Sequence, residues 1–123
     1  MKDITTGKQS ELIQSFEGSE FAESVFLQLH KEFAKVGILI EFNAEDLVSF
    51  SVFKKRLAEE IEVIMRASPN SINQLLYLSD LPEETVHAVF KNEIEPIETL
   101  AEMLLIRISQ KIYYREKYRL GLI

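Results

Sequence analysis

The sequence predicts a single, mainly α-helical domain of five or six helices, and three observations lead to this fold class. The composition is that of a helix-rich globular chain, with 46% hydrophobic residues and only 4 Gly and 3 Pro. Apolar residues recur at steps of three and four along most of the chain, as on the buried face of an amphipathic helix. A length of 123 residues supplies one core and is short for two domains. We therefore expect one domain over residues 1–123.

The N-terminal part, residues 9–66, is predicted to begin with a short helix and a longer one. Residues 1–8 have no apolar periodicity and are expected to fray. Gly18 and Ser19 interrupt the apolar pattern, so we expect the short helix before them and the longer helix, capped by Ser19, after them. Gly37 is expected to end the longer helix, because glycine readily takes the left-handed conformation past a last helical turn.

Residues 38–42 form a short apolar run with a β-branched bias. The run is typical of a strand, but the sequence offers no second strand to pair with it. An extended buried connector and pairing with the same segment of a second subunit are therefore open alternatives. Asn43 favours a helical turn after this run. The next helix is predicted over residues 51–66, where the basic triplet 54–56 is interpreted as a solvated helix face.

Residues 67–117 are predicted to form a helix-turn-helix-like trio and a long last helix. Pro82 and Pro96 each open a helix at a position where a missing N–H costs nothing. Asp80 is expected to cap the helix that starts at Pro82, and Asn92 is expected to end it.

The last helix, predicted over residues 97–117, is apolar on more than one side. Such a helix is either central in its own fold or packed against a partner subunit. Residues 118–123 are expected to form a tail.

The run of residues 71–104 resembles, in its spacing, the helix-turn-helix of the Cro and C1 phage-repressor family. The resemblance lies in an apolar turn residue, two buried positions of a recognition helix, the end of that helix and the start of the next. These positions are held by Leu81, Val86, Val89, Asn92 and Pro96. The chain departs from the pattern at Asp80, where Gly is usual, at Leu76, where a small Ala is usual, and at Pro82, where Ser or Thr is common.

This resemblance implies a DNA-binding regulator whose recognition helix enters the major groove. The candidate nucleic-acid-binding residues lie on the outer side of that helix and in the basic segment beyond it: Thr85, His87, Lys91, Arg107, Lys111 and Arg115. Glu83 and Glu84 near the helix start oppose this function, because carboxylates approach phosphates unfavourably.

The charge distribution also bears on function. The net charge of −6 argues against general phosphate-backbone binding. Between Arg107 and Arg119, five basic side chains accompany a single acid, so this segment carries +4 and the rest of the chain carries −10. With its tyrosines the segment would offer a stacking surface for nucleic acid. The preferred interpretation is that its cations complement the helix dipole and pair with acids of the same protein.

No chemistry-bearing constellation is apparent in the sequence. The absence of Cys excludes disulfides and thiolate sites and suits a reducing cytoplasm. His30 and His87 lie in separate predicted helices without a neighbouring nucleophile, and no Gly-rich phosphate loop is present. The N-terminus lacks the apolar core of a signal peptide, and no apolar run approaches the length of a membrane span.

We therefore expect a cytoplasmic, non-enzymatic protein-interaction or structural module without metal or cofactor. Its partner would be another protein or a second copy of the chain in a homodimer, and no membrane partner is expected. A DNA-binding transcriptional regulator is the alternative.

Overall fold

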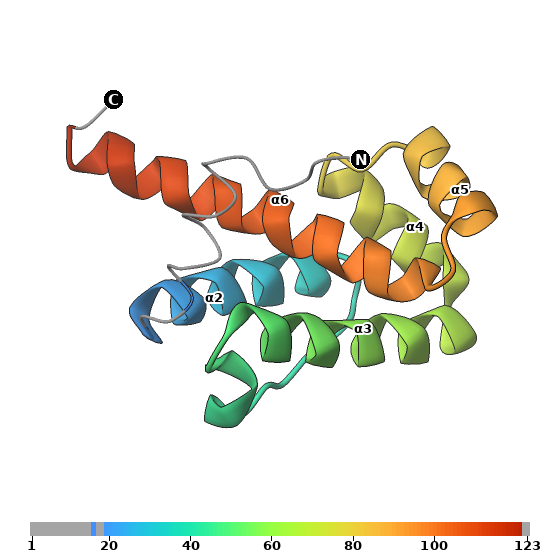
Figure 1. Ribbon diagram of the computed structural model, residues 1–123, viewed down its shortest axis with the longest axis horizontal. Coiled ribbons are helices and arrows are strands. Elements are labelled where there is room, and N and C mark those ends of the chain that lie inside the picture. Colours follow the sequence, from blue (N-terminus) through green and yellow to red (C-terminus); the bar gives the residue numbers. More distant parts are fainter. Residues whose placement is uncertain (1–15, 17–18, 122–123) are drawn as a thin grey trace.

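The computed structural model describes Phe16 and residues 19–121, and within them it contains five α-helices, one 3₁₀ helix and no strand (Figure 1). The predicted mainly α, single-domain fold is confirmed. The short helix predicted before Gly18 and the fraying predicted for residues 1–8 lie outside the described residues. The elements are α2 (Ser19–Lys35), η1 (Ala44–Leu47), α3 (Phe50–Ala67), α4 (Pro69–Leu78), α5 (Glu83–Asn92) and α6 (Pro96–Arg119).

Helix α6 is the central element of the fold. It contacts α2, α3 and α5, while α3 also contacts α4 and η1 (Figure 1). One face of α6 supplies six fully or nearly fully buried apolar side chains: Leu100, Ala101, Leu104, Leu105, Ile108 and Ile112. Of the two alternatives for this helix, the central position is therefore the one observed, since its apolar faces pack within the same chain. The helix also runs two residues past the predicted end at residue 117.

The residues that join α2 to η1 form an extended connector and not a strand. Ile40 is buried, whereas Leu39 is 69% exposed, so the side chains alternate as in a strand while the backbone has no partner strand among the described residues. The Phe42 ring lies 5.1 Å from that of Phe26 and 5.3 Å from that of Phe53, measured between centroids. The alternation explains the apolar run 38–42, and within the described part of the chain the run is the extended connector, since no strand of the same chain pairs with it.

The turn between α4 and α5 corrects one sequence prediction. Asp80 does not cap α5: Pro82 precedes that helix, and no side chain caps it. Asp80 instead ends α4 with a φ of 63°, in the left-handed region that a non-glycine residue rarely takes.

The hydrogen bonds of this turn form the pattern that closes many helices at a left-handed residue. The Leu81 N–H donates to the Leu76 carbonyl at 2.8 Å, and the Asp80 N–H donates to the Tyr77 carbonyl at 3.1 Å. Leu76 and Leu81 are both buried, as expected for the apolar contact that accompanies this motif. The turn thus explains why an apolar residue stands at position 81.

Candidate interaction surfaces

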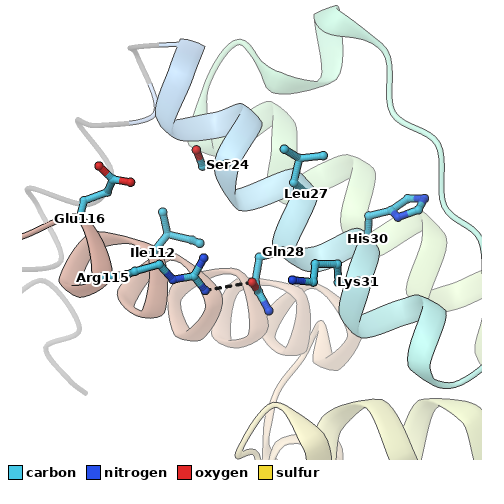
Figure 2. A pocket seen from close by; sticks show the side chains of 8 residues that line it. All are labelled: Ser24, Leu27, Gln28, His30, Lys31, Ile112, Arg115 and Glu116. Carbon is cyan, nitrogen blue, oxygen red and sulfur yellow. Dashed lines mark hydrogen bonds between the residues drawn. The ribbon is translucent and has the colours of Figure 1, made fainter. Parts of the chain in front are cut away.

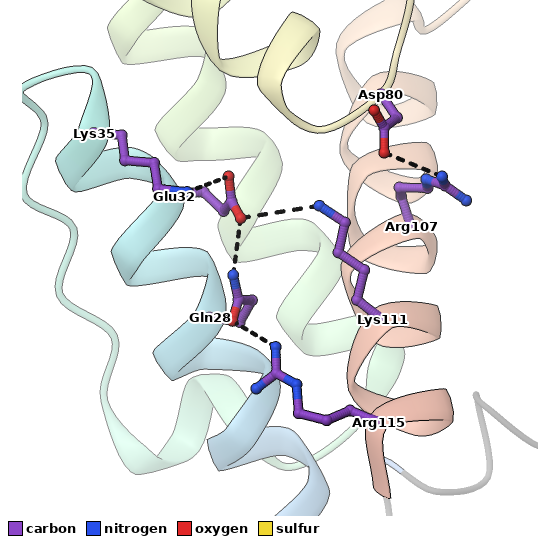
Figure 3. Close-up of polar contacts among 7 residues, drawn as sticks. All are labelled: Gln28, Glu32, Lys35, Asp80, Arg107, Lys111 and Arg115. Carbon is purple, nitrogen blue, oxygen red and sulfur yellow. Dashed lines mark hydrogen bonds and ion pairs between the residues drawn. The ribbon is translucent and has the colours of Figure 1, made fainter. Parts of the chain in front are cut away.

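The cations predicted for nucleic-acid binding on α6 form one row. Arg107, Lys111 and Arg115 follow one another at four-residue steps, so they lie on one face of the helix. Each is turned toward an acceptor of its own chain (Figure 3). Arg107 Nη2 lies 3.1 Å from Asp80 Oδ2, and Lys111 Nζ lies 3.9 Å from Glu32 Oε2. Arg115 Nη2 donates to Gln28 Oε1 at 3.0 Å.

Glu32 is the buried carboxylate that Lys111 of this row contacts. The residue is 3% exposed, and its Oε2 accepts a hydrogen bond of 2.8 Å from Gln28 Nε2. Lys35 Nζ lies 4.0 Å from its other oxygen, so two lysines and an amide compensate the carboxylate. A buried carboxylate needs such partners, because its desolvation is costly. Sequence reasoning missed Glu32, since only the fold brings α2 beside α6.

The other predicted residues lie on a different helix from that row. Thr85, His87 and Lys91 belong to α5, where His87 and Lys91 are exposed and Thr85 is half-buried. Arg115 lies roughly 28 Å along α6 from the first residue of that helix, Pro96, at a rise of 1.5 Å per residue. The six predicted residues therefore come from two helices, and Arg107, near the middle of α6, lies beside the turn that leads into α5.

The outer sides of α4 and α5 enclose two adjoining hollows, which we call the α4–α5 groove. Their volumes are ≈ 210 Å³ and ≈ 480 Å³, and they share Asn73, Glu83 and Val86. The remaining lining residues are Leu76, Tyr77, Leu81, Glu84, His87 and Phe90.

The groove has an apolar floor and an acidic edge. Tyr77 is 77% exposed and Phe90 is 39% exposed, and Ile94 just beyond α5 is 97% exposed. Glu83 and Glu84 line the groove and are themselves exposed. Large apolar side chains that are exposed to water next to a pair of carboxylates are typical of a surface that binds another protein.

A third hollow lies between α2 and the second half of α6, and we call it the α2–α6 pocket. Its volume is ≈ 380 Å³ (Figure 2). Its lining mixes polar and apolar surface and comprises Ser24, Leu27, Gln28, His30, Lys31, Ile112, Arg115 and Glu116. Of these residues, the sequence prediction included only Arg115.

The described residues offer neither a metal-binding cluster nor a membrane-spanning helix. No group of three or more His, Cys, Asp or Glu residues is placed there to hold a metal ion. In the same part of the chain, no helix combines the length and the apolar character that a membrane crossing requires.

Comparison of the chain with protein-family models, with curated proteins and with solved structures gave no significant match.

Proposed function

We propose that this protein is a non-enzymatic interaction module whose α4–α5 groove binds an amphipathic, basic helix of a partner protein. The observation that carries the proposal is the combination of exposed Tyr77 and Phe90 with the acidic edge formed by Glu83 and Glu84. An amphipathic helix inserts apolar anchors into such a groove, and flanking cations complement acids at its edge.

The chemistry of the groove favours this partner class over others. Full burial of one large apolar side chain contributes about 1.5–3 kcal/mol, so an aromatic anchor at this surface would supply useful affinity. An acidic partner would meet Glu83, Glu84 and the −10 carried outside the basic segment. A basic helix therefore fits both the apolar floor and the local charge.

The experiment compares two synthetic helical peptides with the same apolar face, one carrying Lys and the other Glu on its polar face. We expect only the Lys peptide to cause saturable amide shifts in a ¹⁵N NMR titration, centred on Tyr77, Val86 and Phe90. Phe90→Gln should weaken this binding about tenfold or more, whereas Leu39→Gln, an equally polar change at an exposed site on the connector, should not. Equal binding of both peptides, or of neither, would contradict the proposal.

A second copy of the chain is the other occupant that this experiment must separate, because its basic segment carries the required charge. Gel filtration with light scattering measures this directly. A concentration-dependent dimer that Phe90→Gln dissociates would assign the groove to self-association and would replace the heterologous partner. A monomer under all conditions would remove the homodimer prediction.

DNA binding through α5 is the second candidate, and one observation favours it. Asp80 has a φ of 63° at the position where the resembling repressor family usually has Gly. It ranks second because Arg107 and Lys111 are paired with carboxylates of the chain, and because His87 and Lys91 share α5 with two glutamates. If α5 reads DNA, a random duplex should bind at low salt, and Lys91→Glu should weaken it. No retention of the protein on duplex DNA at low salt would remove this candidate.

A further inference from the structure

The lining of the α2–α6 pocket contains two cations and one acid, Glu116, on a protein whose net charge is −6. Lys31 reaches it from α2 and Arg115 from α6, and Figure 2 shows their cationic ends on two sides of Gln28. Within the described part of the chain, neither cation has a carboxylate partner. The neighbouring acids are already engaged: Glu32 with Lys35 and Lys111, and Glu116 with Arg119 at 2.6 Å.

Gln28 holds the Arg115 guanidinium in place. Its Oε1 accepts from Arg115 Nη2 at 3.0 Å, while its Nε2 donates to the buried Glu32 at 2.8 Å. Because the amide is held at both ends, the guanidinium is oriented before any ligand arrives. A guanidinium has five N–H donors in a planar fork, so most of them are left for a further acceptor.

We propose that the α2–α6 pocket binds the phosphate group of a small phosphorylated molecule. Phosphate suits this arrangement because its oxygens accept two parallel hydrogen bonds from Arg115 while Lys31 supplies a second charge. Ser24 also lines the pocket and adds a hydroxyl, whereas the His30 ring is turned away from the two cations (Figure 2). The volume of ≈ 380 Å³ lies at the lower end of the range for small-molecule sites.

A nucleic-acid backbone offers the same group, but the pocket fits it less well. Backbone binding draws its affinity from many cations arrayed along a strand. Here the cations converge on one hollow that Leu27 and Glu116 also line. The site is distinct from the α4–α5 groove, because the two share no lining residue. The inference therefore stands whether or not the groove binds a partner.

The test is a ¹⁵N NMR titration with adenosine monophosphate and, as a matched control, adenosine, at constant ionic strength. We expect saturable shifts of Gln28, Lys31 and Arg115 with the monophosphate and with inorganic phosphate, and none with adenosine. Arg115→Gln should weaken binding about tenfold, and Lys31→Met should weaken it several-fold. Lys55→Met, which removes an exposed cation on α3, should leave the affinity unchanged.

The result that overturns the proposal is the lack of saturable shifts with either phosphate compound, or shifts that persist unchanged in Arg115→Gln. Lys31 is exposed, so Lys31→Met keeps the test valid if Arg115→Gln impairs folding. A random duplex forms the last arm of the experiment. Binding of the duplex that depends on Arg115, without binding of the monophosphate, would assign the pocket to a nucleic-acid backbone and overturn the small-molecule ligand.

Discussion

At Glu32, the stability of the fold depends on how well a buried negative charge is compensated. Its carboxylate is buried between α2 and α6 and depends on Lys111 and Lys35 for compensation. Both ammonium groups lie close to 4 Å away, and the Lys111 side chain is 31% exposed, so water screens part of the attraction. Gln28 supplies the shorter contact.

We expect Lys111→Met to destabilise the protein by about 1–2 kcal/mol, because it leaves a buried carboxylate with less compensation. Adding Glu32→Leu should recover most of that loss, since the uncompensated charge is removed and apolar groups fill the space. Urea unfolding followed by circular dichroism measures both differences. An additive double mutant would show that Glu32 and Lys111 do not interact in solution.

At Ser109, by contrast, we expect that removal of a polar group does not destabilise the protein. Its hydroxyl is fully buried on α6 and has no hydrogen-bond partner among the described residues. Ser109→Ala removes an unpaired polar atom and improves helix propensity, so we expect stability to stay unchanged or to rise by up to about 1 kcal/mol. Ser109→Leu should lower the stability, because the added atoms overpack the core around α6. A clear loss of stability in Ser109→Ala would reveal a partner for the hydroxyl.

At the scale of elements, the turn from α4 to α5 depends on the left-handed residue Asp80. Its exposed ion pair with Arg107 contributes little, about 0–1 kcal/mol. We therefore expect Asp80→Gly to be neutral or to stabilise by up to about 1 kcal/mol, because glycine takes this conformation without a Cβ clash.

Asp80→Val should destabilise by about 1–2 kcal/mol, because a β-branched residue is strongly disfavoured at positive φ. Arg107→Gln is the control that removes the ion pair and keeps the turn. Thermal unfolding of Asp80→Gly, Asp80→Val and Arg107→Gln shows whether the backbone conformation at Asp80 or the ion pair contributes more to stability. If Arg107→Gln costs as much as Asp80→Val, the ion pair and not the backbone conformation controls the turn.

Helix positions were largely predictable from the sequence, whereas contacts between helices were not. Apolar periodicity located α3 and α6, and Pro96 and Asn92 mark the helix ends where expected. Asp80 was misassigned because Asp is common both at the start of a helix and in left-handed turns, and local sequence does not separate these uses.

For the candidate sites too, positions along one helix could be predicted, whereas contacts between helices could not. Four-residue spacing places Arg107, Lys111 and Arg115 on one helix face, and that much follows from helix geometry. Their acceptors come from α2 and from the α4–α5 turn, so only the packed fold identifies them. The α4–α5 groove likewise forms from side chains of two helices, and neither helix indicates a hollow by itself.

At the scale of the whole molecule, the acidic apolar groove and the cation-lined pocket are built from different helices. The acidic, apolar groove is lined by side chains of α4, α5 and the turn between them, whereas the cations of the α2–α6 pocket come from α2 and the second half of α6. Raising the salt concentration should therefore weaken a basic peptide at the groove and a phosphate at the pocket, because both interactions join exposed opposite charges.

Helix α6 also joins the two halves of the chain into one core, and this leads to a prediction about cooperativity. It contacts α2 and α3 from the N-terminal half and α5 from the C-terminal half, and Leu104 is fully buried in the common core. Leu104→Ala should therefore destabilise both halves together, by about 2–5 kcal/mol. Native-state hydrogen exchange should show similar losses of protection in α3 and α4, while the exposed-site control Leu39→Ala changes neither. A loss confined to one half would show that the halves unfold separately, because a shared core transmits the cavity at Leu104 to every helix packed against it.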